Sequence, residues 1–189
     1  IREQVVQERI DHDLHCLAIF CKINHSTWWN SNCVDDRNIT PAAEFNFYFD
    51  PEAAHLVLEA FERYDLADWE ATIAHGLHHE RVAEWLRADS DRARFYDRIS
   101  EKTRSWSADR RGDHWFAADA LAMAFVLAPD GSVELAERPL AIELQGAHAR
   151  GASVVDWRRE GGQPDKANIL LRYAQTRFET LIESALAAG

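Results

Sequence analysis

Hydrophobic and polar positions change their period along the chain, and each change marks an expected helix or strand. The stretch "EFNFYF" at residues 44–49 places its three Phe on alternate positions, which predicts a strand with those rings on one face. Asp50 and Pro51 then predict a helix start, because the carboxylate caps free amides and Pro suits the first helical position. Apolar residues continue this helix over residues 51–63. The apolar stripe consists of Ala53, Ala54, Val57, Leu58 and Phe61.

The rest of the chain mixes helical and extended patterns. Residues 66–76 are predicted to form a short strand and a turn. Further helices are predicted at residues 79–88, 90–106, 116–128 and 174–188, with an Asp/Ser cap before the second and a loop at 107–113. Strands are predicted at residues 140–144, 152–157 and 168–173. This mixture favours an α/β fold in which consecutive strands between residues 132 and 173 form a local β excursion.

Composition and charge narrow the classes of function. With 189 residues and 47% hydrophobic content, the chain is the size of one domain with a real core. A net charge of -11 would repel a phosphate backbone, so nucleic acid is not expected as a partner. No apolar window reaches the roughly eighteen residues of a membrane span, and the first 30 residues lack the pattern of a signal peptide.

The cysteines suggest a compartment but no disulfide framework. Cys16, Cys21 and Cys33 are odd in number and confined to the start of the chain, so a reducing, cytoplasmic location is expected. Together with nearby histidines they have the residue types of a zinc site, but the spacing matches no standard pattern, so zinc binding is disfavoured. The set is His12, His15, Cys16, Cys21, His25 and Cys33.

Polar residues elsewhere allow a structural and a functional interpretation. Asp119 stands alone among apolar residues at a helix start, where a carboxylate placed against the helix dipole is the simpler explanation. Asn38, Glu44 and Asn46 carry amide and carboxylate groups that could hold neighbouring sugar hydroxyls, or equally serve as loop and strand-end hydrogen-bonding groups. The alternating charges of residues 89–113 are typical of solvated helical faces.

Two long segments resemble one enzyme family. "NITPAAEFNFYFDPEAAHLVLEA", from residue 38, is similar to the central motif of the inosine-uridine preferring nucleoside hydrolases, in which Asn-x-Thr-Pro-x-Ala-Glu-x-Asn precedes Asp-Pro-Glu-Ala-Ala. "ADALAMAFVLAPDGSVELAERPLAIELQGAHARGASVVD", from residue 118, resembles the family's C-terminal segment with its Asp-bearing helix and Arg-Gly turn. The resemblance implies an open, mostly parallel α/β sheet with flanking helices, a tightly bound Ca²⁺, and hydrolysis of ribonucleosides to base and ribose.

The resemblance also implies roles for individual residues. Asn38, Glu44 and Asn46 would contact the ribose hydroxyls, and Asp119 would be a calcium ligand. Polar groups directed at ribose hydroxyls would reject deoxyribose, because they would be left unpaired in a closed site. The family passes through a cationic, oxocarbenium-like sugar, which fixed carboxylates stabilise.

Three departures separate this sequence from the family pattern. The Asp-Thr-Asp-Pro-Gly-x-Asp-Asp run that supplies most calcium carboxylates and the base is absent, so no catalytic residue is assigned. The nearest acidic pairs, Asp35-Asp36 and Asp11-x-Asp13, lack the Pro-Gly turn. "WWNSNCVDD" stands where a Met-Gly-Gly strand end is usual, and Ala118 replaces a His that protonates the leaving base, with His114 the nearest substitute.

These departures predict a chain with two unequal parts. Residues 1–36 are expected to be a non-matching N-terminal segment, with a helix-like start and an apolar run, and residues 37–189 the C-terminal part of a nucleoside hydrolase domain. The chain is therefore expected to be truncated and of doubtful activity. The alternative is a non-catalytic fragment that binds a nucleoside or a partner. Missing strands would expose a sheet edge, so homo-oligomers are also expected.

Overall fold

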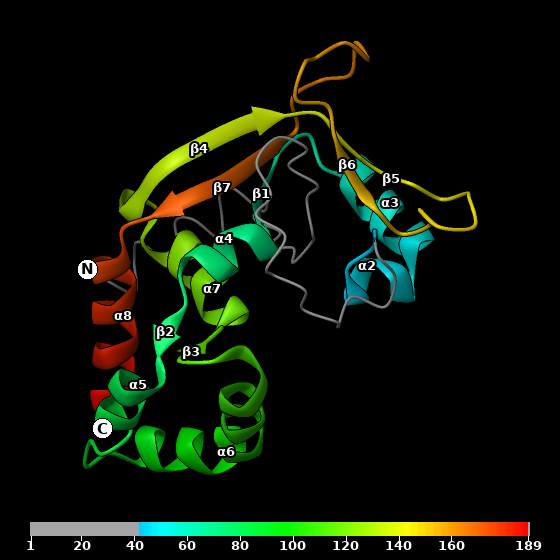
Figure 1. The fold of residues 1–189 in the computed structure, drawn as a ribbon. Helices are drawn as coiled ribbons and strands as arrows, with labels where there is room; N and C mark the ends of the chain where they lie inside the picture. Colours follow the sequence, from blue (N-terminus) through cyan, green and yellow to red (C-terminus); the bar gives the residue numbers. More distant parts are fainter. Residues whose placement is uncertain (1–41, 189) are drawn as a thin grey trace.

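The computed structural model of the chain describes residues 42–188, and it consists of helices packed around a small open sheet (Figure 1). Several of the sequence predictions lie outside the described residues. They are the helix-like start and apolar run of residues 1–36, the His/Cys set of residues 12–33, and the ribose role of Asn38.

The central sheet has three strands in the order β1-β7-β4. Strand β1 (Tyr64–Ala67) pairs parallel with β7 (Ala167–Tyr173), whereas β4 (Ser132–Arg138) pairs antiparallel with β7. The α/β class is confirmed, but the described sheet is mixed rather than mostly parallel. An antiparallel neighbour is possible here because β4 returns to β7 through a hairpin and loop instead of a crossover helix.

Two short strand pairs complete the β structure. Strands β5 (Leu140–Ile142) and β6 (Ser153–Val155) form an antiparallel pair, which confirms the predicted β excursion. Strands β2 (Leu77–His78) and β3 (His114–Trp115) form a second pair beside the helices. Leu140 and Ile142 are both buried, as their alternation predicts.

The helices are short except for one. Their bounds are α2 (Phe45–Phe49), α3 (Pro51–Ala60), α4 (Trp69–Ala74), α5 (His79–Trp85), α6 (Asp91–Arg111), α7 (Ala118–Leu127) and α8 (Gln175–Ala187), with a 3-10 turn η1 at Pro129–Gly131. Both predicted caps are present, since Asp50 Oδ1 accepts a hydrogen bond from the Ala53 amide at 2.9 Å and Ser90 Oγ from the Ala93 amide at 3.0 Å. Among the residues that the structure describes, no helix is long and apolar enough to cross a membrane.

Three local predictions are wrong. Residues 45–49 form helix α2 instead of a strand, because the Glu44 side chain caps the amides that follow it, and of the three Phe only Phe47 is buried. Residues 69–74 form α4 rather than a turn, since Asp68 caps a helix there. Helix α6 continues to Arg111 through the predicted loop. The helix predicted at residues 51–63 ends at Ala60, where Phe61 turns to an extended conformation. Ala54, Leu58 and Phe61 pack inward, but Ala53 and Val57 are exposed.

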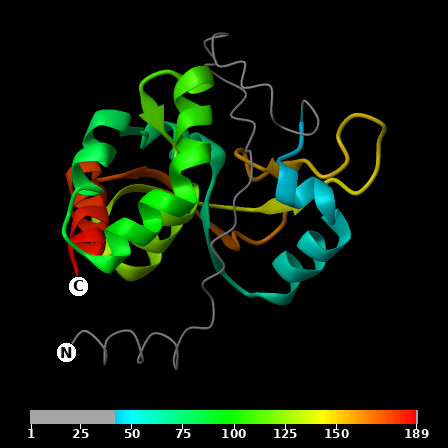
Figure 2. The same cartoon turned by 90° about the horizontal axis from the view of Figure 1, so that it is seen from below.

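A hydrophobic core lies on each face of the sheet. Alternate residues of β7 divide between them, with Leu170 in one core and Ile169 in the other. The first core lies under α4, α5, α7 and α8, and the second under α2, α3 and the β5–β6 pair. Figures 1 and 2 show the same division, with α2 and α3 apart from α7 and α8. A strand with both faces covered is apolar where it is buried, which explains Ile169, Leu170 and Leu171 in the middle of β7.

Candidate functional site

Glu44 and Asn46 form a hydrogen-bonded pair at the start of α2. Glu44 Oε2 accepts hydrogen bonds from the Asn46 amide at 2.8 Å and the Phe47 amide at 3.3 Å, so Glu44 is the N-cap of the helix. The Asn46 side-chain amide donates to Glu44 Oε1 at 3.2 Å. Two of the three residues predicted to contact ribose are therefore side by side, in a helical turn rather than a strand.

Burial affects the charge of this pair. Glu44 is half-buried, and burial raises the pKa of its carboxyl above the ordinary 4.5, although the amides of Phe47, Asn46 and Phe45 partly offset the rise. Each carboxylate oxygen has two lone pairs, so the bonds within α2 leave acceptor capacity for a ligand hydroxyl. Asn46 is exposed and can present its amide to the same ligand.

Asp119 lies on a different helix and over a different core. It occupies the first turn of α7, where it is exposed, and the N-cap residue Ala117 offers no capping side chain. A carboxylate at this position is favoured by the helix dipole, which agrees with the structural interpretation. Helix α7 packs in the first core and α2 in the second, so the helices that carry Asp119 and the Glu44–Asn46 pair cover opposite faces of the sheet.

The described residues do not form a complete calcium site. Within residues 42–188 there is no group of three or more His, Cys, Asp or Glu side chains placed to hold a metal ion. Ca²⁺ takes six to eight oxygen ligands, of which Asp119 would supply one or two. The residues present therefore do not fit a bound Ca²⁺ by themselves.

Asp68 is a buried acid that the sequence analysis did not single out. It follows β1, is 1% exposed, and its Oδ1 accepts a hydrogen bond from the Ala71 amide at 2.6 Å at the start of α4. Its Oδ2 is buried and has no hydrogen-bond partner among residues 42–188. Burial, together with the charge of Glu70, raises the pKa of Asp68 to about 8. The carboxyl group is therefore protonated at neutral pH, a state typical of functional acids but also of strained caps.

A shallow cavity of about 320 Å³ adjoins Asp68. It is lined by Asp68, Glu70, Ala71, Glu134, Leu170, Leu171 and Arg172. The sequence signal for Asp68 was an Asp placed between a strand and a possible helix start. That signal was missed because residues 66–76 were interpreted as a strand and turn.

His114 lies in an aromatic cluster. Its ring centre is 4.2 Å from that of His78 and 6.4 Å from that of Phe116, which precedes α7. The Arg111 guanidinium lies over the rings of Trp69, Trp106 and Phe116, at 5.0 to 5.7 Å from their centres. The contacts join α4, α6 and the start of α7, so they fix these helix ends relative to one another. The use of His114 as a proton donor stays a prediction.

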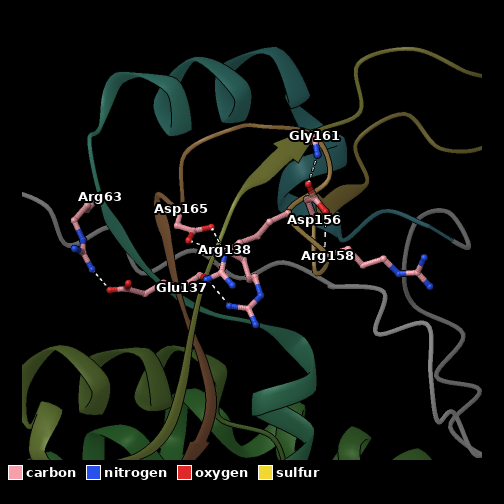
Figure 3. A network of polar contacts seen from close by, with 8 residues as sticks. Arg63, Glu137, Arg138, Asp156, Arg158, Gly161 and Asp165 are labelled. Carbon is pink, nitrogen blue, oxygen red and sulfur yellow. Dashed lines mark hydrogen bonds and ion pairs between the residues drawn. The ribbon is translucent and has the colours of Figure 1, made fainter.

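A network of polar contacts joins the end of β4 to the loop after β6 (Figure 3). Arg63 pairs with Glu137, and Asp156 Oδ2 accepts a hydrogen bond from the Gly161 amide at 2.7 Å (Figure 3). Arg159 bonds Asp165 at 2.9 Å and the Glu137 carbonyl at 3.1 Å. The bond from Arg159 to Glu137 attaches the loop after β6 to β4. Because acidic and basic groups alternate in the network, they form no surface patch of one charge.

A family profile and individual relatives all match this chain to nucleoside hydrolases. The profile described as "Inosine-uridine preferring nucleoside hydrolase" matches residues 22–180. The pyrimidine-specific ribonucleoside hydrolase RihA of Salmonella newport (strain SL254) is 26% identical over 151 residues, which is 79% of this chain and 48% of that protein. RihA of Escherichia coli (strain K12) matches with the same identity and coverage. The chain thus spans about half the length of the curated relatives it matches.

Solved structures show the same fold. An inosine-guanosine nucleoside hydrolase superposes with a TM-score of 0.69 at 21% identity, over 78% of this chain and 47% of that chain. The plant nucleoside hydrolase PpNRh1 superposes with a TM-score of 0.72 at 16% identity, over 91% of this chain and 52% of that chain. At these identities the likeness extends to the fold alone.

Proposed function

Because the chain belongs to the inosine-uridine preferring nucleoside hydrolase family, we propose that it binds ribonucleosides and contributes to hydrolysis of their N-glycosidic bond to base and ribose. Residues 37–189 would form the C-terminal part of the hydrolase domain. The similar proteins include a pyrimidine-specific ribonucleoside hydrolase and an inosine-guanosine nucleoside hydrolase. Both a pyrimidine and a purine nucleoside are therefore candidate ligands.

The observation that carries the proposal is the Glu44–Asn46 pair. The Asn46 side-chain amide lies 3.2 Å from Glu44 Oε1, so the two groups can bind two neighbouring hydroxyls. The Glu44 carboxylate accepts hydrogen bonds, and the Asn46 amide both donates and accepts them. Ribose has such hydroxyls, and loss of one would leave a polar group without a partner. The Glu44 carboxylate would also favour the positive charge that develops on the sugar as the glycosidic bond breaks.

Calcium enters the proposal only through Asp119. We infer that Asp119 would be one ligand, and a complete site would need further oxygen ligands from outside residues 42–188. The residues described here would bind and orient the ribose.

A second candidate is nucleoside binding without cleavage. It is favoured by the lack of a clustered metal site within residues 42–188, and residues 1–189 contain no Asp-Thr-Asp-Pro-Gly-x-Asp-Asp run. We propose that the protein is located in the cytoplasm, because the number and spacing of its cysteines suggest no disulfide framework. We also propose self-association, supported by the exposed Val133 and Leu135 of β4, which ends the described sheet.

One experiment separates the two candidates. The protein is incubated with uridine or inosine and Ca²⁺, free base is measured by chromatography, and uridine binding is measured by equilibrium dialysis. Turnover that Asp119→Ala abolishes supports the hydrolase. Binding that Glu44→Gln weakens, without turnover, supports the second candidate. If uridine and inosine neither bind nor react, the proposed function is wrong.

A further inference from the structure

The loop that joins β5 to β6 lies against the helices of the candidate ribose site. The base of this loop is closed by two backbone hydrogen bonds, from Gly151 to the Glu143 carbonyl at 2.7 Å and from Glu143 to the Ala152 carbonyl at 2.9 Å. Both views of the fold place the β5–β6 pair beside α2 and α3. We name residues 143–152 the hairpin loop.

Gly151 brings the hairpin loop into direct contact with the backbone of α2. Its φ is +82°, a conformation that favours glycine. A Cβ atom at this position would lie 2.8 Å from Tyr48 Cα, 3.2 Å from the Tyr48 amide nitrogen and 3.3 Å from Ala43 Cβ. The first of these contacts is with backbone, which cannot rotate away as a side chain does. Only glycine fits without moving either α2 or the loop.

Arg150 joins the same loop to α3. One guanidinium nitrogen donates to the Leu144 carbonyl at 2.7 Å within the loop, and the other donates to Glu52 Oε2 at 2.7 Å in the first turn of α3. The bond to Arg150 holds the pKa of Glu52 below its ordinary 4.5. Arg150 and Gly151 thus contact the two helices on either side of Asp50.

Helix α2 depends on such contacts. It has five residues, too few for a helix that is stable alone, and only Phe47 among them is buried. Its remaining support comes from the Glu44 cap and from neighbours that touch its backbone. Because Glu44 and Asn46 belong to this turn, any shift of α2 changes the geometry of the pair.

We propose that Arg150 and Gly151 are positioning residues that hold α2, and with it the Glu44–Asn46 pair, in the arrangement that receives ribose. The identity of the ligand rests on the proposed function. The role in holding α2 does not, so the two can fail separately.

The test compares two alanine substitutions in the same loop. Gly151→Ala places a methyl group against α2, whereas Gly146→Ala imposes similar strain, at φ +89°, with no atom of the described residues within 4 Å of the new Cβ. Backbone amide exchange of residues 45–50 is measured by hydrogen–deuterium exchange with mass spectrometry. Exchange should be at least about tenfold faster in Gly151→Ala and unchanged in Gly146→Ala. Equal effects of the two variants would overturn the proposal.

Substitutions of Arg150 give a second test that does not depend on the fit of a methyl group. Arg150→Ala should also accelerate exchange in residues 45–50, and Arg150→Lys, which keeps a cation for Glu52, should restore part of the protection. Uridine affinity, measured on the same proteins, should fall in the same order as protection. If neither Arg150→Ala nor Gly151→Ala changes exchange, the inference is wrong. If protection falls as expected but the unmodified protein binds no uridine, only the proposed function is wrong.

Discussion

Replacing Asp68 by Asn should change how the stability of the protein depends on pH. Burial raises the pKa of this carboxyl from an ordinary 3.8 to about 8 in the folded protein. Below the unfolded pKa both states carry the proton, so no stability is lost. Between the two values only the unfolded chain gives up its proton, and the free energy of unfolding falls as pH rises. Above about 8 the loss is complete.

The expected size follows from the pKa difference. At about 1.4 kcal/mol for each pKa unit, the rise corresponds to a loss of about 6 kcal/mol between the two limits. Asn has the shape of the protonated acid, keeps an oxygen for the Ala71 amide and does not titrate. Asp68→Asn should therefore match the original protein near pH 4 and exceed its stability by several kcal/mol near pH 8.5.

Urea unfolding followed by tryptophan fluorescence measures this difference at several pH values. Asp91→Asn is the matched control, because Asp91 also lies at a helix start but is fully exposed, and Arg94 holds its pKa below the ordinary value. The difference in unfolding free energy between Asp91→Asn and the original protein should stay constant from about pH 5 to pH 8.5. A stability difference for Asp68→Asn that is equal at both pH values would refute the reasoning about the buried carboxyl.

Three further predictions concern binding, packing and association. Uridine affinity should weaken as pH falls through the raised pKa of Glu44, because the carboxylate is the acceptor, and Glu44→Gln should remove this pH dependence in dialysis. Tyr173→Phe should cost about 1 to 3 kcal/mol in urea unfolding, because the buried hydroxyl donates to the Ala128 carbonyl at 2.6 Å, whereas Tyr48→Phe should cost little. Leu135→Lys on the edge strand β4 should weaken self-association and so lower the apparent mass in sedimentation. An unchanged mass would exclude β4 from the interface between copies of the chain.

Local signals in the sequence were sufficient for several elements. Asp50 and Ser90 cap helices as predicted, because a cap depends on a side chain and the amides two or three residues later. Leu140 and Ile142 are buried in β5, because alternation follows directly from the geometry of a strand. The family motifs also singled out Glu44 and Asn46, although the alternating Phe residues wrongly predicted a strand there.

The tertiary structure decided what the local pattern left ambiguous. Alternating Phe in residues 45–49 suited a strand, but the Glu44 cap and the packing of Phe47 in the second core favour helix α2, in which Phe47 is the one buried Phe. The burial of Asp68 and the fit of Gly151 against Tyr48 depend on segments far apart in the chain. The sequence by itself determined which chemical groups and helix caps were present, because those depend on neighbouring residues. Only the fold decided which groups are desolvated and which backbones touch, because both depend on long-range packing.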